Sequence, residues 1–300
     1  MNNFIKKITN PHVLLLFIVN KTGLSNLMSD KLYVKLLFRR VMGKKLNLEN
    51  PQTFNEKLNW LKLYDRKSEY SKMVDKYDAK KYVADIIGEE YIIPTYGIWD
   101  KFDDIDFDKL PNQFVLKCTH DSGSVIICRD KNKFDLKYAR NKIGKALKTN
   151  LYFSGREYPY KYLKPRIIAE ELLLNYNDQG ALSDYKFVCF DGRVHSVMVC
   201  TDREVSYPKF YFFNKKWELL RLHFGGLKTS ANFTLPKPIN VELMFEIAAK
   251  LSKNIPFLRV DLYSVNNNIY FGELTFYPSS GFDSSLLPET ESLFGSKIEI

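Results

Sequence analysis

Alternating apolar and polar residues near the C-terminus predict a β-hairpin. Residues 257–265 (FLRVDLYSV) and 269–276 (IYFGELTF) have the pattern of two strands, with three consecutive asparagines between them. Asparagine tolerates the positive φ that tight hairpin turns require, so this spacing favours a short turn. The pairing places Asp261 and Glu273 on facing strands. We take this hairpin as the feature around which the rest of the chain is organised.

Two facing carboxylates have a specific chemical consequence. They repel each other, and burying both is costly unless a cation lies between them. Mg²⁺ suits such a pair, because it takes one or two protein carboxylates and completes its shell with water and phosphate oxygens. The alternative is that Asp261 and Glu273 are solvated on the open face of an antiparallel sheet, and periodicity alone leaves both interpretations open.

Apolar periodicity and chain-breaking residues divide the rest of the chain into helices and strands. Asn50-Pro51 breaks the chain, and Thr53 with Glu56 three residues later forms a capping box that predicts a helix start. Asp191-Gly192 is a second hairpin signal. Helices are predicted over 28–46, 53–63, 73–87, 135–149 and 239–252, and strands over 114–118, 125–128, 166–174 and 210–224. Helices and strands together predict an α+β fold.

The N-terminal region contains two apolar segments. Val13–Val19 is much shorter than the ~20 residues that a membrane-spanning helix needs, and no cleavage pattern of small residues follows it. We therefore expect a buried or interfacial helix there. The basic helix over 28–46 is interpreted as an ordinary surface helix, with binding to anionic lipid as the alternative.

Composition narrows the choice of partners. Lys and Arg number 45 against 35 Asp and Glu, and the net charge of +10 favours anionic partners such as nucleotides or acidic sugars. The four cysteines lie inside apolar runs without metal-ligand spacing. We therefore expect buried thiols in a reducing compartment, with no zinc site and no disulfide.

Three polar features interrupt the apolar runs between residues 100 and 175. Lys117 lies near the end of a strand, and the small residues Asp121–Ser124 follow it. Such a loop either forms a hairpin lid whose backbone N–H groups approach phosphates or is a plain turn. Glu170 and Glu171 lie within an apolar strand. There they either serve a linker that pairs with a purine edge, with a glutamate on the ribose hydroxyl, or lie at a solvated strand end.

Two further candidates have weaker chemical support. Asp104, Asp106 and Asp108 form overlapping D-x-D pairs, a pattern found at metal and sugar-nucleotide sites of glycosyltransferases, but we expect them in a solvated connection before Pro111. His195 lies in a predicted strand, where a lone histidine is more often structural than catalytic.

In the order and spacing of these parts the chain resembles the ATP-grasp superfamily, most closely its TupA-like branch, over roughly residues 50–289. The resemblance implies an α+β ATP-grasp fold with two lobes around a nucleotide cleft. It implies a helical N-terminal segment over 1–69, an N-terminal lobe over 70–168 and a C-terminal lobe over 169–300. It also implies ATP and Mg²⁺ as cofactors.

The resemblance assigns roles to individual residues. It implies phosphate lysines at Lys76, in VDKY, and Lys117, a lid over Ser122, Gly123 and Ser124, an adenine connector at Glu170, Glu171 and Leu173, metal ligands at Asp261, Glu273 and Thr275, a substrate loop at Pro278–Gly281, and catalytic roles for Arg259 and Lys186. Thr275 stands where the wider superfamily has asparagine, so the number of bound metal ions stays open.

The implied activity is ligation of a carboxylate to an amine through an acyl phosphate, with Arg259 stabilising the developing charge. The expected acid is a uronic-acid glycan or an amino acid used to modify a cell-surface polysaccharide, such as a capsule. We expect a cytoplasmic chain, with peripheral contact at the inner membrane face as an alternative, and no nucleic acid partner. The alternative activities are an ATP-grasp phosphotransferase and a metal-dependent glycosyltransferase.

Overall fold

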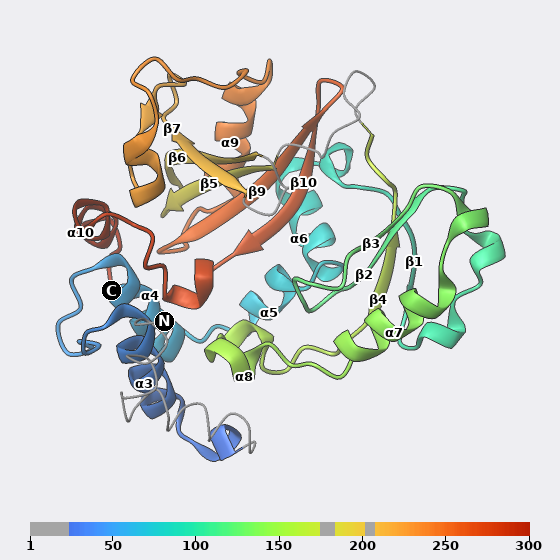
Figure 1. The fold of residues 1–300 in the computed structure, drawn as a ribbon, viewed down its shortest axis with the longest axis horizontal. Helices are drawn as coiled ribbons and strands as arrows, with labels where there is room; N and C mark the ends of the chain where they lie inside the picture. Colours follow the sequence, from blue (N-terminus) through green and yellow to red (C-terminus); the bar gives the residue numbers. More distant parts are fainter. Residues whose placement is uncertain (1–23, 175–183, 202–207) are drawn as a thin grey trace, which may run out of the picture.

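The structure is a computed structural model that describes residues 24–174, 184–201 and 208–300, so the predicted helix over Val13–Val19 lies outside the described residues. Two antiparallel sheets with packed helices confirm the α+β prediction (Figure 1). The α-helices are α3 (Asp30–Met42), α4 (Phe54–Tyr64), α5 (Glu69–Val74), α6 (Asp78–Ile87), α7 (Leu136–Ala146), α8 (Tyr152–Gly155), α9 (Val241–Leu251) and α10 (Pro288–Ser296). The 3₁₀ helices are η1 (Leu24–Leu27), η2 (Glu89–Tyr91), η3 (Phe102–Asp104), η4 (Phe107–Lys109), η5 (Lys131–Lys133), η6 (Tyr158–Tyr160), η7 (Phe224–Lys228) and η8 (Pro278–Gly281).

The first sheet has the strand order β1-β4-β2-β3. Its strands are β1 (Thr95–Trp99), β2 (Phe114–Cys118), β3 (Ile126–Cys128) and β4 (Ile167–Glu170). Helix α7 contacts β2, and Ala139 and Ile143 of α7 belong to the same buried cluster as Phe114 and Leu116. This sheet continues to Glu170, two residues beyond the expected lobe boundary at 168.

The second sheet has the order β10-β9-β5-β6-β7-β8 and contains the predicted hairpins. Its strands are β5 (Asp184–Phe190), β6 (Arg193–Thr201), β7 (Lys209–Phe213), β8 (Leu219–Leu220), β9 (Leu258–Val265) and β10 (Asn268–Thr275). Asn266 and Asn267 turn between β9 and β10 with φ of 52° and 66°, as the asparagine run predicts. Phe187 of β5 packs edge-on against Phe245 of α9, with ring centroids 5.1 Å apart. Helix α9 therefore covers one face of this sheet.

Helices α5 and α6 pack on the second sheet rather than the first. Tyr70, Met73 and Val83 belong to the large buried cluster that contains Leu274 of β10. Residues 70–87 thus share a core with the C-terminal sheet, although the resemblance assigned them to the N-terminal lobe. Among the described residues, no helix is long and apolar enough to cross a membrane.

Two predicted helix boundaries need correction. The single helix predicted over 73–87 is wrong, because the chain breaks between α5 and α6, where Asp75 Oδ1 accepts hydrogen bonds from the N–H groups of Tyr77 and Asp78. The helix predicted to end at Leu46 ends at Met42, because Gly43 adopts a left-handed conformation with φ of 71°. By contrast, α4 begins at the predicted place, where the N–H of Thr53 donates to Glu56 Oε2 at 3.1 Å.

Candidate active site

Three charged side chains form one row across the second sheet. Lys186 of β5 is the direct partner of Asp261 of β9, and Asp261 is the direct partner of Glu273 of β10. The predicted facing of the two carboxylates is therefore confirmed. Side chains alternate between the faces of a strand, so Arg259, two residues before Asp261, projects from the same face. This face lies opposite the one that α9 covers.

Arg259 lies between the two carboxylates. Its Nε and Nη2 donate to Asp261 Oδ1 and Oδ2, both at 2.7 Å, and Nη2 also donates to Glu273 Oε1 at 2.7 Å. Lys186 completes the cluster by bonding Asp261 Oδ2 and Asp184 Oδ2. In this structure the cation that separates the acids is thus a guanidinium group, which the sequence interpretation did not anticipate.

Pairing overcomes the effect of burial on this cluster. Burial alone would raise the pKa of Asp261, but Arg259 and Lys186 hold it below its usual value. Burial would lower the pKa values of Arg259 and Lys186, and their carboxylate partners raise both instead. Arg259, Lys186 and Asp261 are therefore all charged near neutral pH.

The residues fit a magnesium ion that takes most of its ligands from elsewhere. Both oxygens of buried Asp261 are bonded to cations, whereas the side chain of Glu273 is 40% exposed and no described residue bonds its Oε2. Thr275 donates its hydroxyl to Glu273 Oε1 at 3.2 Å. No group of three or more His, Cys, Asp or Glu residues that could hold a metal occurs within the described ranges. Glu273 alone thus presents an open oxygen, consistent with a metal held largely by phosphate and water.

Glu170 binds two lysines instead of standing free for a ribose. Its Oε1 accepts from Lys80 Nζ of α6 at 2.7 Å, and its Oε2 pairs with Lys117 of β2. Burial would raise the pKa of Glu170, but the two lysines lower it. Each oxygen of this carboxylate thus already pairs with one lysine, and the expected ribose contact stays a prediction. Lys117 and Lys80 share one buried counter-ion beside the first sheet.

Lys76 lies in the turn between α5 and α6 and joins the two halves of the site. Its Nζ donates to the carbonyl of Asp121 in the loop after β2. Burial lowers the pKa of Lys76; Glu273 offsets part of this effect and Lys117 adds to it. Lys76 is thus close enough to interact electrostatically with both Lys117 of the first sheet and Glu273 of the second. The structure therefore brings the predicted phosphate lysines and the predicted metal carboxylates into one region.

The predicted lid residues divide into two kinds. Ser122 and Gly123 are exposed at the tip of the loop between β2 and β3. Ser124 is buried, donates its hydroxyl to Asp121 Oδ1 at 2.6 Å and accepts from the N–H of Cys118 at 2.7 Å. Ser124 therefore shapes the loop, whereas Ser122 and Gly123 are accessible, and their predicted role in a lid over phosphates stays a prediction.

The predicted adenine connector directly follows β4. The N–H of Glu171 donates to the carbonyl of Pro94 at 3.0 Å, and its side chain is exposed. Leu173 packs in a small buried cluster with Ile93 and Val265. Residues 171–174 belong to no strand, as a connector between the two sheets requires.

The loop after β10, which contains η8, is held by a polar stripe on α4. Asn55, Asn59 and Lys62 are fully buried at helical spacing. Asn55 bonds both the N–H and the carbonyl of Asp283, Asn59 donates to the carbonyl of Gly281 at 2.7 Å, and Lys62 donates to the carbonyl of Ser280 at 2.5 Å. We call these three residues the α4 ladder.

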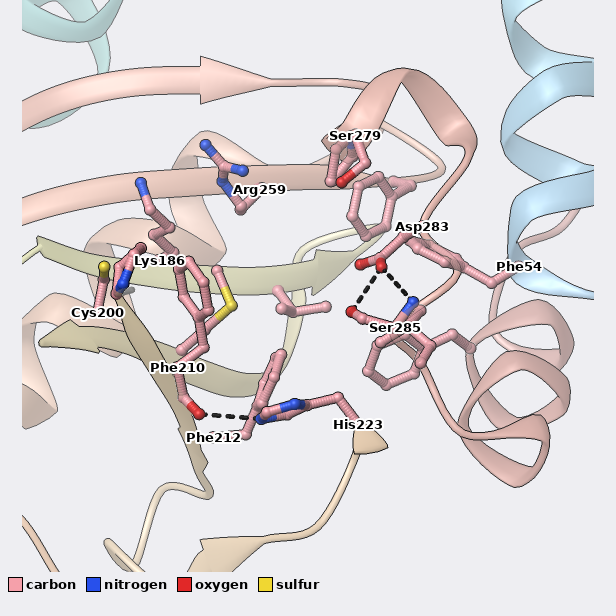
Figure 2. A pocket seen from close by; sticks show the side chains of 17 residues that line it. Phe54, Lys186, Cys200, Phe210, Phe212, His223, Arg259, Ser279, Asp283 and Ser285 are labelled. Atoms are coloured by element: carbon pink, nitrogen blue, oxygen red, sulfur yellow. Dashed lines mark hydrogen bonds between the residues drawn. The ribbon is translucent and has the colours of Figure 1, made fainter. Parts of the chain in front are cut away.

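The α4 ladder supports an unusual backbone. Ser279, Ser280 and Gly281 all have positive φ, of 50°, 54° and 73°. Non-glycine residues in this conformation cost about 1–3 kcal/mol each and persist only where the surroundings hold them. Because this loop borders the Arg259 side of the sheet (Figure 2), the α4 ladder fixes one wall of the site.

Sequence reasoning missed Lys80, Asp184 and the α4 ladder. Lys80 lies four residues after Lys76, and Asp184 two residues before Lys186 on the same face of β5. Those spacings were the available signals. For the α4 ladder, the available signal was three polar residues at positions i, i+4 and i+7 of a helix with many buried positions.

Within the part of the chain that the structure describes, the remaining candidates form no contact with the charged residues described above. Asp104, Asp106 and Asp108 are exposed in or beside the short turns η3 and η4, where Asp106 Oδ1 accepts from the N–H of Asp108 at 3.2 Å. This agrees with the solvated connection that the sequence predicts. His195 of β6 packs against Phe294 of α10, with ring centroids 5.1 Å apart, which is a structural contact.

Comparisons with known proteins identify one sequence family and several weakly similar structures. The sequence profile described as TupA-like ATPgrasp matches residues 56–299. D-alanine–D-alanine ligase from Bacillus anthracis is similar at 15% identity, covering 83% of this chain and 69% of that one, with a TM-score of 0.42. The corresponding ligase from Helicobacter pylori is similar at 16% identity over 82% and 69%, with a TM-score of 0.43. D-cycloserine synthetase DcsG is similar at 12% identity over 75% and 69%, with a TM-score of 0.42.

Comparison with curated proteins gives no match. The structural similarities are weak, so the assignment rests on the sequence profile, which covers most of the chain. The chain therefore belongs to the TupA-like ATP-grasp family.

Proposed function

We propose that this chain joins a carboxylate to an amine through an acyl phosphate, with Arg259 and Lys186 at the reacting centre. One observation supports this most strongly. Arg259 and Lys186 line a pocket of about 470 Å³ on the sheet face that also carries Asp261 and Glu273 (Figure 2). An anionic substrate in that pocket would lie beside the proposed phosphate site.

The proposed roles follow from charge and position. Lys76 and Lys117 bind phosphate oxygens of ATP, and charge-assisted hydrogen bonds are the strong ones. Glu273 holds Mg²⁺, whose chemistry is to neutralise charge on the phosphates. Nη1 of Arg259 has no partner among the described residues, so it can donate to a substrate oxygen while Nε and Nη2 stay fixed by the carboxylates.

The proposed ligation has two steps. An oxygen of the substrate carboxylate attacks the γ-phosphorus, and the bond to the β-phosphate oxygen breaks to release ADP. The amine then attacks the carbonyl carbon, and the bond to the phosphate oxygen breaks and releases inorganic phosphate. Arg259 and Lys186 hold the acid in the first step and offset the oxyanion charge in the second.

The acid that the resemblance implies is a uronic-acid glycan or an amino acid used on a cell-surface polysaccharide. The net charge of +10 favours either anion. We place this reaction in the cytoplasm, and the alternative is peripheral contact at the inner membrane face through the basic side of α3. Val34 and Phe38 of α3 are fully buried, so such contact would be electrostatic rather than by insertion of this apolar face.

Hydroxylamine trapping tests the reaction class. With ATP, Mg²⁺ and a panel of carboxylic acids, hydroxylamine in place of the amine should yield a hydroxamate together with ADP and inorganic phosphate. A stable phosphorylated product without free phosphate would instead identify a phosphotransferase. Stabilisation by UDP-sugars but not by ATP, lost in the D104N/D106N double variant, would identify a glycosyltransferase.

A further inference from the structure

The pocket beside Arg259 has a markedly apolar wall. It lies between the face of β5, β6 and β7 opposite α9 and the segment from Pro278 to Leu286 (Figure 2). Aromatic and aliphatic side chains form most of its lining, among them Met198, Phe210, Phe212 and Leu286. A volume of about 470 Å³ is within the range of small-molecule pockets.

The positive charge of the pocket lies at one side. Arg259 and Lys186 lie together there, and Figure 2 shows both side chains beside each other on neighbouring strands. Asp283 lies on the opposite wall, near Ser285. An anionic group at this side would contact two cations that are already paired with Asp184, Asp261 and Glu273, and Nη1 of Arg259 is the donor that these carboxylates leave open.

The polar groups elsewhere in the wall largely bond to one another. Nε2 of His223 bonds the carbonyl of Phe210 at 2.9 Å. Ser285 donates its N–H and its hydroxyl to Asp283 Oδ1, at 2.9 and 2.6 Å. A sugar carries a polar group on nearly every carbon, and each such group would lose water without gaining enough partners here. An apolar body has no hydrogen bonds to water to lose, and its burial stabilises the complex.

We propose that this pocket holds the body of the carboxylate substrate and that this body is apolar, aliphatic or aromatic, rather than a polyhydroxylated uronic acid. The carboxylate lies at Arg259 and Lys186, and the apolar body contacts Met198, Phe210 and Phe212. This inference rests on the proposed function, because it identifies the anion at Arg259 as the acid to be activated.

The test compares two acids of equal charge, 3-phenylpropionate and glucuronate, by calorimetric titration of the full chain with a non-hydrolysable ATP analogue and Mg²⁺ present. We expect 3-phenylpropionate to bind about tenfold more tightly or better, since its ring is buried against the apolar wall. 3-Phenylpropanamide, which keeps the ring and lacks the charge, should bind more weakly than the acid. Equal or tighter binding of glucuronate, or no binding of 3-phenylpropionate, overturns the proposal.

A matched pair of variants locates the binding. Met198 and Met42 are both partly buried. Met42 packs against the small buried cluster that contains Val34 and Phe38 of α3, and no residue of that cluster lines the pocket. M198Q, a change of similar shape that adds polarity, should weaken 3-phenylpropionate about tenfold and leave binding of the ATP analogue unchanged. M42Q should change neither. Retained binding of the ATP analogue also shows that each variant is folded.

The two proposals fail in different ways. If 3-phenylpropionate binds through Met198 but no acid supports hydroxamate formation with hydroxylamine or phosphate release with an amine, the proposed reaction fails and the pocket assignment stands. If an acid supports phosphate release equally well in M198Q and in the unmodified chain, the pocket assignment fails and the ligase stands.

Discussion

Replacing Asn55 by leucine removes one member of the α4 ladder with little change of shape. Asn55 Oδ1 accepts from the N–H of Asp283 at 2.9 Å, and Asn55 Nδ2 donates to the carbonyl of Asp283 at 3.0 Å. It also donates to Glu291 of α10. Leucine keeps the volume but offers none of these bonds, so the backbone of Asp283 loses its partner.

The expected cost can be worked from these contacts. A buried polar group that loses its partner costs about 1–3 kcal/mol, and Asp283 has two such groups facing Asn55. Asp283 is half-buried, so water replaces part of the loss. We expect the free energy of unfolding to fall by about 2–3 kcal/mol. A typical total of about 5–15 kcal/mol leaves the variant folded.

Urea unfolding and ligand titration measure the effect. Because Asp283 and Ser279 line the pocket while Lys76 and Lys117 lie elsewhere, N55L should weaken 3-phenylpropionate about tenfold and leave ATP binding within about a factor of two. The control N214L alters an exposed turn and should cost about 1 kcal/mol or less. A stability loss no larger than that of N214L, or equal weakening of ATP, would refute this account of the ladder.

Three further predictions concern charged groups. Lys117→Ala should weaken ATP about tenfold or more, because a charge-assisted hydrogen bond contributes about 1.5–3 kcal/mol; unchanged ATP affinity by calorimetry contradicts the phosphate role. Asp261→Asn should lower the free energy of unfolding by about 3–5 kcal/mol, because it leaves Arg259 and Lys186 buried without their shared counter-ion; an equally stable variant in urea argues against that pairing. Burial lowers the pKa of Lys62 from 10.5 to about 7. Between these pH values Lys62 is protonated in the unfolded chain and neutral in the folded one. The contribution of Lys62 to the free energy of unfolding therefore rises from pH 7 to pH 10.5. Lys62→Met should remove that rise, and parallel stability curves for the two proteins would contradict the assignment.

The sequence predicted those features that depend on neighbouring residues. The asparagine turn sets the register of β9 and β10 as far as Phe271, and a shift of one residue between Phe271 and Glu273 then brings Glu273 opposite Asp261. The start of α4 and the turn at Asp191-Gly192 were predictable for the same reason, since a capping box and a positive φ are local. Glycine and asparagine carry that information at single positions.

The contacts within the site were less predictable because they join distant parts of the chain. A glutamate at the end of a strand can face either solvent or a ligand. In this chain Lys80, from a helix, and Lys117, from a neighbouring strand, both pair with Glu170. Arg259 was expected to act on the substrate, but no pattern indicates that its guanidinium also bridges two carboxylates. The α4 ladder binds a loop more than 200 residues away, and no local pattern specifies such a pairing.

In the proposed reaction an oxygen of the acid attacks the γ-phosphate of ATP and leaves in inorganic phosphate. The most direct measurement uses the acid that gives the strongest ATP-dependent hydroxamate formation, labelled with ¹⁸O in its carboxylate, followed by mass spectrometry of the released phosphate. The account predicts one labelled oxygen in each phosphate released with product. Unlabelled phosphate, or label retained entirely in the organic product, would contradict it.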